Sequence, residues 1–126
     1  MRKDVILVVE DEELNRAVFR DALQVEGYEV FTASGTAEAV AVLDAREVSA
    51  VVCDIHMPHN GVKLFEYLLK NYPHLEERFV FVTGDPSRAA ALAGLARPAK
   101  CLFRPFPIRD LIDTVRGALP PEPVLF

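Results

Sequence analysis

The chain has 126 residues, of which 51% are hydrophobic and 26% charged, and its formal net charge is −5 at pH 7. This composition predicts one globular domain over residues 1–119, followed by an extended, proline-rich tail over residues 120–126. A negative chain without a basic block is not expected to bind nucleic acid or membranes directly. No stretch is typical of a signal peptide or membrane span, and two cysteines give no disulfide framework, so we expect a cytoplasmic protein.

Strands and amphipathic helices alternate through the first half of the chain. Residues 5–9 are a continuous apolar run that stops at an acidic turn, which predicts a strand covered on both faces. A helix is expected next, ended by Gly27, with four apolar residues at helical spacing on one face. Those residues are Leu14, Val18, Ala22 and Val25. A strand over residues 28–32 then precedes a second helix, with Ser34 or Thr36 as the candidate N-cap.

The second half continues the alternation around a central strand. Residues 48–53 are mostly apolar, show no alternation and run directly into Asp54. A third helix follows Gly61, and residues 79–82 predict a fourth strand. Asp85-Pro86 is typical of a helix start, so a weakly apolar fourth helix is expected over residues 87–96. Residues 100–103 predict the fifth strand. The last helix has the clearest amphipathic pattern, with apolar residues at Ile108, Leu111, Ile112, Val115 and Leu119.

Five alternations of strand and helix predict an α/β fold. Parallel strands that are joined by helices require right-handed crossovers, which place helices on both faces of the sheet. We therefore expect a flavodoxin-like, doubly wound, five-stranded parallel sheet with strand order 2-1-3-4-5. Ligands of such sheets bind beyond the carboxyl ends of the strands, where the strand order reverses.

Polar side chains stand at these strand ends. They are Glu10 and Asp11 after the first strand, Asp54 after the third, Thr83 after the fourth and Arg104 after the fifth. Strands one and three are neighbours in the expected order, so three carboxylates should share one crevice with a hydroxyl and a cation. Clustered acids repel one another, and Mg²⁺ is the hard ion that such oxygen ligands favour. Asp54 is the natural phosphoryl acceptor, because carboxylates form aspartyl-phosphate in known covalent mechanisms.

Four motifs carry a family resemblance in the expected order. They are Ile-Leu-Val-Val-Glu10-Asp11-Glu-Glu-Leu-Asn15-Arg16, Val-Val-Cys-Asp54-Ile-His-Met57-Pro58, Val-Phe-Val-Thr83-Gly84 and Phe103-Arg104-Pro105-Phe106. The chain resembles a response-regulator receiver domain of two-component signalling over residues 3–119. Its opening motif is similar to that of receivers attached to hybrid histidine kinases.

The resemblance implies a site and a mechanism. Mg²⁺ would bind Asp11, Asp54 and the backbone carbonyl of His56, with Glu10 acting through water, and Mn²⁺ could replace it. A phosphohistidine donor would phosphorylate Asp54. Thr83 would then swing toward the phosphoryl group and change the face around the fourth helix and the fifth strand.

The resemblance also implies protein partners. A histidine kinase or a histidine phosphotransfer protein would dock on the first helix, at Asn15, Arg16 and Phe19. Apart from the resemblance, the weakly apolar fourth helix and the fifth strand are where a homodimer is expected to form.

Three residues depart from the family pattern. Arg104 stands where the family has a nearly invariant lysine, and arginine is not equivalent to lysine at a packed phosphate site. Gly61 follows Asp54 by seven positions instead of the usual eight, which shortens the loop. Cys101 replaces the aromatic switch residue and is also consistent with a small buried hydrophobe. These departures leave a second function open, a pseudo-receiver that is not phosphorylated and serves as a docking module.

Two further alternatives involve His56. Cys53, His56 and His59 have a spacing that would suit a Zn²⁺ or Cu²⁺ site, although Cys53 should point into the core and the histidines lie on a loop. A phosphatase of the haloacid-dehalogenase type would use Asp54 as nucleophile, but it needs a second aspartate where this chain has His56. A phosphoacceptor with self-dephosphorylation, rather than a turnover enzyme, is therefore the expected chemistry.

Overall fold

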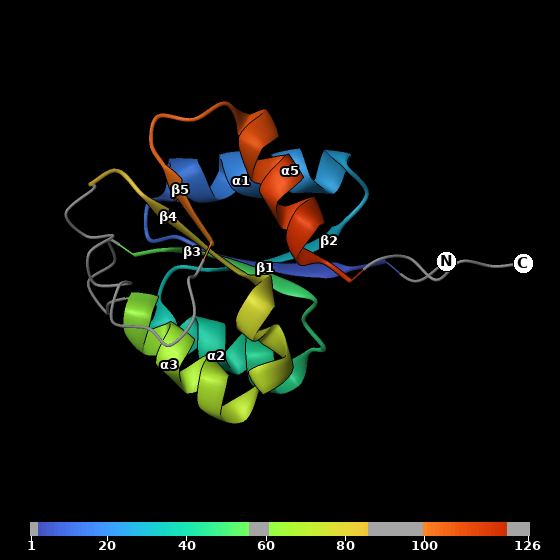
Figure 1. Cartoon of the computed structure of the whole chain (residues 1–126), viewed down its shortest axis with the longest axis vertical. Coiled ribbons are helices and arrows are strands. Elements are labelled where there is room, and N and C mark those ends of the chain that lie inside the picture. Colours follow the sequence, from blue (N-terminus) through green and yellow to red (C-terminus); the bar gives the residue numbers. More distant parts are fainter. Residues whose placement is uncertain (1–2, 56–60, 86–99, 121–126) are drawn as a thin grey trace, which may run out of the picture.

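Five parallel strands form the centre of the molecule in the order β2-β1-β3-β4-β5, as predicted. The computed structural model describes residues 3–55, 61–85 and 100–120 (Figure 1). The strands are β1 (Val5–Val9), β2 (Glu29–Ala33), β3 (Ala50–Asp54), β4 (Phe79–Thr83) and β5 (Lys100–Phe103). Because all pairings are parallel, the carboxyl ends of the strands meet at one edge of the sheet.

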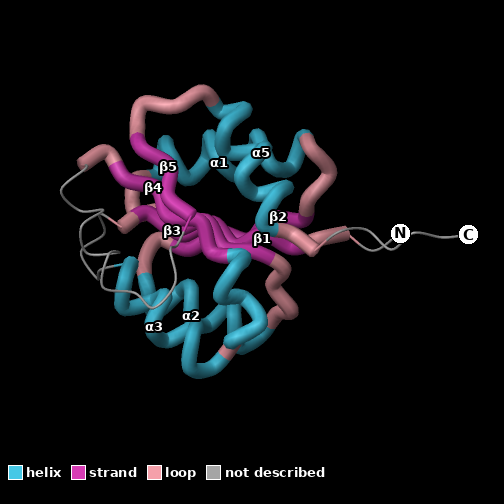
Figure 2. Tube along the Cα trace, in the orientation of Figure 1, coloured by secondary structure: helices cyan, strands magenta, loops and turns pink. Residues whose placement is uncertain are grey.

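Helices cover both faces of this sheet. Figures 1 and 2 show α1 and α5 on one face and α2 and α3 on the other. The described helices are α1 (Glu13–Val25), α2 (Thr36–Ala45), α3 (Gly61–Asn71), the 3₁₀ helix η1 (Pro73–Arg78) and α5 (Ile108–Ala118). None of them is long and apolar enough to span a bilayer. The expected fourth helix over residues 87–96 and nearly all of the tail lie outside the described residues.

The central strands are buried on both faces because successive side chains enter two different cores. Along β4, Phe79 and Phe81 enter the core beneath α2 and α3, whereas Val80 and Val82 enter the core beneath α1 and α5. Phe65 of α3 packs edge-on against Phe79 and Phe81, with ring centroids 4.9 and 5.4 Å away. Burial of side chains this large stabilises the fold by roughly 1.5–3 kcal/mol each. Uninterrupted apolar runs therefore predicted these strands correctly.

The inward face of α1 differs from the prediction. Leu14, Val18 and Val25 are 70%, 47% and 85% exposed, while Phe19 and Leu23 are buried. Both sets of residues recur at helical spacing, so the pattern alone did not decide between two neighbouring apolar stripes. The stripe with the larger side chains packs against the sheet, since it removes more apolar area from water. This leaves an exposed apolar stripe on α1.

Two helix ends also differ from the predictions. The N-cap of α2 is Gly35, and Ser34 instead donates hydrogen bonds from its amide and its hydroxyl to the Glu38 carboxylate. Ile108, expected in the core, is 39% exposed because it lies in the first turn of α5. Gly27 follows the C-cap of α1 with φ of 99°, so its predicted role as the end of α1 is confirmed.

Candidate functional site

The first and third strands place two carboxylates side by side at the edge of the sheet. Val9 of β1 pairs with Cys53 of β3, so Glu10 and Asp54 occupy the next positions along the two strands. The Glu10 amide donates a hydrogen bond of 3.0 Å to the Ala33 carbonyl and continues the ladder with β2. This register brings together residues that lie more than forty positions apart in the sequence.

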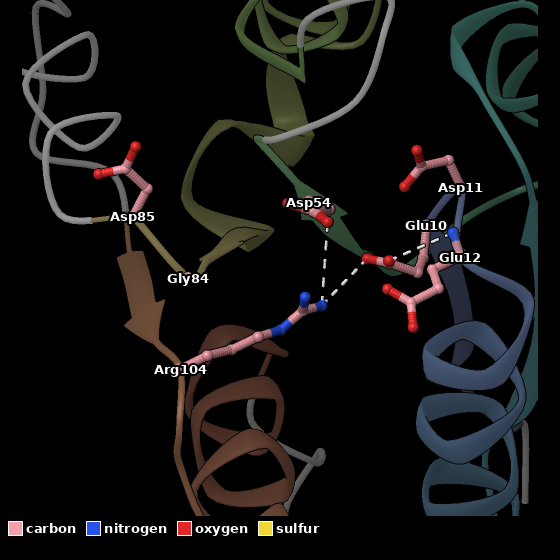
Figure 3. Close-up of a pocket in the computed structure, with 7 residues that line it drawn as sticks. All are labelled: Glu10, Asp11, Glu12, Asp54, Gly84, Asp85 and Arg104. Carbon is pink, nitrogen blue, oxygen red and sulfur yellow. Dashed lines mark hydrogen bonds and ion pairs between the residues drawn. The ribbon is translucent and has the colours of Figure 1, made fainter.

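Glu10, Asp11 and Asp54 form one acidic cluster (Figure 3). One carboxylate oxygen from each residue lies within 4.8 Å of those of the other two. Glu10 and Asp54 are only 1% and 4% exposed, whereas Asp11 is exposed. The predicted convergence of these three acids is therefore present. With Glu12, Gly84, Asp85 and Arg104 they line one pocket.

Arg104 extends from the end of β5 into this pocket. Its Nη2 atom lies 3.1 Å from Glu10 Oε2 and 3.9 Å from Asp54 Oδ2 (Figure 3). Its amide donates a hydrogen bond of 2.8 Å to the Thr83 carbonyl, which fixes the chain where the side chain departs. The predicted cation is therefore at the site, and it pairs most closely with Glu10.

The pKa of the Glu10 carboxyl is raised by its burial and by the negative charge around it. Burial, together with the hydrogen bond and the charge of Asp54, raises this pKa from 4.5 to about 7, and the Arg104 cation opposes the rise. One guanidinium therefore compensates the acids only in part. A divalent cation with oxygen ligands fits this cluster, because it would supply the missing positive charge.

Thr83 is buried at the end of β4, with its hydroxyl directed at the next turn. Its Oγ1 donates to the Asp85 carbonyl at 3.2 Å and accepts from the Asp85 amide at 3.1 Å. Gly84 and Asp85 from this turn line the acidic pocket. The hydroxyl is thus next to the pocket and bound within its own turn.

The remaining predicted residues have different outcomes. His56 and His59 lie outside the described residues, so the backbone ligand and the histidines of the transition-metal alternative are not described. Cys53 is wholly buried among the residues of the core beneath α2 and α3, as predicted, and burial raises the pKa of its thiol. Cys101 packs against the same core, and its partial burial raises its pKa as well.

Two residues support the site in ways that the sequence did not reveal. Arg16 donates from Nη1 to the Glu10 carbonyl at 2.8 Å and to the Asp11 carbonyl at 3.4 Å, and so holds the acidic turn. Phe19, expected on a docking surface, is only 6% exposed and lies beneath the Arg104 guanidinium. The only sequence signal for these contacts was the position of Arg16 and Phe19 in the helix that follows Glu10. Helical periodicity alone does not identify such contacts.

Gly61 marks the close packing of α3 against the end of β3. A Cβ atom at this position would lie 2.7 Å from the Asp54 carbonyl oxygen and 3.0 Å from Cys53 Sγ. Those distances are shorter than van der Waals contact. The first residue of α3 is therefore restricted to glycine by the backbone of Asp54.

The sequence of the chain is similar to those of known proteins. The sequence model of the response regulator receiver domain matches residues 6–116. The aerobic respiration control protein ArcA of Escherichia coli K12 is 29% identical over 120 residues, which are 94% of this chain and 50% of ArcA. The chain thus spans about half the length of this relative. The polar-differentiation response regulator DivK of Brucella ovis is 24% identical and covers 90% of this chain and 94% of DivK.

Solved structures agree with the fold. A CheY-like receiver domain from Methanospirillum hungatei has a TM-score of 0.83 at 26% identity, covering 92% of this chain and 93% of that chain. The response regulator TrrA from Thermotoga maritima, solved with Mg²⁺ and BeF, has a TM-score of 0.82 at 26% identity. It covers 92% of this chain and 99% of the TrrA chain. With the acidic pocket in place and 111 residues matched, from 6 to 116, the chain belongs to the response regulator receiver domain family.

Proposed function

We propose that this receiver domain accepts a phosphoryl group on Asp54 from a phosphohistidine donor, in a phosphorelay that signals through protein contacts. The observation that carries the proposal is the convergence of Glu10, Asp11 and Asp54 within 4.8 Å, beside the Arg104 cation. Repulsion makes such a cluster costly in a fold, and phosphoryl transfer explains why it is there.

Asp11 and Asp54 would hold Mg²⁺, with Glu10 acting through water, and Mn²⁺ could replace it. The oxygen donors and the raised pKa of Glu10 fit a divalent ion. When bound, the ion neutralises charge on the phosphoryl oxygens. The backbone carbonyl of His56 remains a proposed ligand.

In the proposed transfer, a carboxylate oxygen of Asp54 bonds to phosphorus as the phosphorus–nitrogen bond of the donor breaks. The imidazole leaves with the electron pair, and the product is an acyl phosphate. The Arg104 guanidinium would move some of its N–H donors from Glu10 to the phosphoryl oxygens, which guanidinium groups bind well. Thr83 would exchange its bonds to Asp85 for a bond to the same group, and this exchange would be the switch. Cys101 stands where the family has its aromatic switch residue.

Asp54→Asn is expected to reduce labelling by acetyl phosphate and Mg²⁺ to background, because an amide oxygen is a poor nucleophile toward phosphorus. Asp21→Asn is the matched control, since Asp21 is an exposed acid of α1, away from the pocket. It should be labelled as fully as the wild type. Undiminished labelling of Asp54→Asn would refute the assignment of the acceptor.

The partner surface is proposed on α1, next to the pocket. Phe19 is buried, so the earlier set of Asn15, Arg16 and Phe19 needs correction, and the exposed Leu14 and Val18 offer apolar area instead. A histidine kinase or a histidine phosphotransfer domain would bring its phosphohistidine to Asp54 over this face.

Leu14→Ser is expected to slow transfer from a phosphorylated histidine phosphotransfer protein by roughly tenfold, the effect of losing about 1.4 kcal/mol of contact. Labelling by acetyl phosphate should stay unchanged, because that small donor needs no docking. Val25→Ser is the control, as it removes an exposed apolar residue at the far end of α1. Equal rates for Leu14→Ser and the wild type would contradict the surface.

Two further proposals concern the oligomeric state and the location of the protein. A homodimer would form through the fourth helix and β5, whose last residue Phe103 is 47% exposed at the sheet edge. A monomeric mass in sedimentation of the phosphorylated protein would refute it.

A cytoplasmic location is consistent with two free thiols. Fractionation of cells that express the protein tests the location.

One observation favours the pseudo-receiver as a second candidate. Arg104 already pairs with Glu10 and Asp54, so it occupies oxygen atoms that a metal and a phosphoryl donor need. Labelling that is absent in the wild type and present in Arg104→Lys would establish this alternative. Labelling of the wild type would exclude it.

A further inference from the structure

Arg104 reaches the acidic pocket across the ring of Phe19. Its Cζ atom lies 5.6 Å from the centroid of the Phe19 ring, while its Nη2 atom lies 3.1 Å from Glu10. Phe19 is 6% exposed and stacks on Phe106, with centroids 6.2 Å apart and an interplanar angle of 22°. Residues of α1, of the turn after β1 and of the segment after β5 thus meet around one guanidinium.

The contact explains how an arginine fits this position. Arginine has a long stem, and its side chain is 28% exposed here, so without support the guanidinium would have many conformations in water. A planar, weakly hydrated guanidinium stacks on an aromatic face while its nitrogen atoms bind carboxylates at the edge. A lysine ammonium is a point charge and gains less from such a surface.

We propose that Phe19 is a positioning residue, which holds the Arg104 guanidinium across the pocket and makes it a built-in cation that competes with the divalent ion for Glu10. The positioning itself stands on the Phe19, Arg104 and Glu10 contacts, and only its consequence for Mg²⁺ rests on the proposed function. Arginine at position 104 depends on the aromatic residue at position 19.

The first experiment uses the metal-free full chain in EDTA and follows the arginine Nε–Hε signals by NMR. The Arg104 signal, assigned by its loss in Arg104→Met, should be shifted by the ring current of Phe19. In Phe19→Leu it should move to the position of solvent-exposed arginines. Arg46 is the internal reference, because its guanidinium lies 5.0 Å from the Phe31 ring and should not respond. An Arg104 signal that stays in place in Phe19→Leu would overturn the proposal.

The second experiment is a double-mutant cycle read by Mg²⁺ affinity, measured by calorimetry. Phe19→Leu should lower the dissociation constant about threefold when residue 104 is arginine, because the released guanidinium leaves Glu10 free. In the Arg104→Met background the same change should have no effect. A purely structural role for Phe19 would shift both backgrounds equally, and that result would refute competition.

Leu23→Val is the matched control for lost packing. Leu23 is the next inward residue of α1 and lies in the same core, so its truncation lowers stability without touching Arg104. It should change neither the Arg104 signal nor the Mg²⁺ affinity, and a change equal to that of Phe19→Leu would count against the proposal. If Asp54 is not phosphorylated while both experiments succeed, the proposed function fails and the positioning role stands.

Discussion

In the absence of metal, the free energy of unfolding is expected to fall as pH rises from about 4.5 to about 7, and Glu10→Gln should remove most of that fall. The Glu10 carboxyl has a pKa of about 7 in the fold against 4.5 ordinarily. Between these values the folded protein holds a proton that the unfolded chain has lost, so this contribution is complete below pH 4.5 and is lost as pH passes 7. At about 1.4 kcal/mol per pH unit, the loss is on the order of 3 kcal/mol.

Urea unfolding of both proteins in EDTA at pH 5, 6, 7 and 8 measures this effect. The stability of Glu10→Gln relative to the wild type should rise from pH 5 to about pH 7 and then level off toward pH 8, because the amide carries no charge to bury. Glu12→Gln is the control, since it removes an exposed carboxylate of the same size two residues away. Mg²⁺ should reverse the order at pH 8 by stabilising only the ionised cluster. A difference between Glu10→Gln and the wild type that is constant over the series would contradict the account of Glu10.

Gly61→Ala is expected to destabilise the protein by about 2–3 kcal/mol, the cost of overpacking a close contact. The added Cβ would meet the Asp54 carbonyl oxygen at 2.7 Å and the Ile55 Cα atom at 3.2 Å. Both are backbone atoms, of the last residue of β3 and of the residue after it, so α3 or Asp54 has to shift. We therefore also expect weaker Mg²⁺ binding and slower labelling of Asp54.

Gly117→Ala provides the opposite case for comparison. Gly117 lies in α5, and a Cβ there would have no neighbour within 4 Å. Alanine at an open helical position should stabilise the protein by up to about 1 kcal/mol. Urea midpoints at pH 7 compare the two variants, and a Gly61→Ala protein as stable as the wild type would show that α3 does not press on the end of β3.

The fold was predictable because each local pattern agreed with the sheet. Short apolar runs between helices, such as residues 79–82, predict buried strands. The strand order then determines which strand ends lie next to each other. The convergence of Glu10, Asp11 and Asp54 followed from that order alone, without knowledge of any contact.

The finer features of the site depend on packing that sequence patterns do not encode. Periodicity on α1 allowed Leu14 or Phe19 to face inward, and side-chain volume decided for Phe19. The pairing of Arg104 with Glu10 depends on side-chain rotamers and on the Phe19 ring. The sequence therefore predicted a cation at the pocket but not which carboxylate it pairs with. The Gly61 contact requires three-dimensional distances.

Intact-mass analysis of the wild-type chain after incubation with acetyl phosphate tests the central claim most directly, that the clustered acids and Asp54 form a metal-dependent phosphoacceptor. We predict the addition of one phosphoryl group in Mg²⁺, none in excess EDTA, and none in Asp54→Asn with Mg²⁺. A wild-type chain that stays unmodified in Mg²⁺, or one that is modified equally in EDTA, would contradict the account.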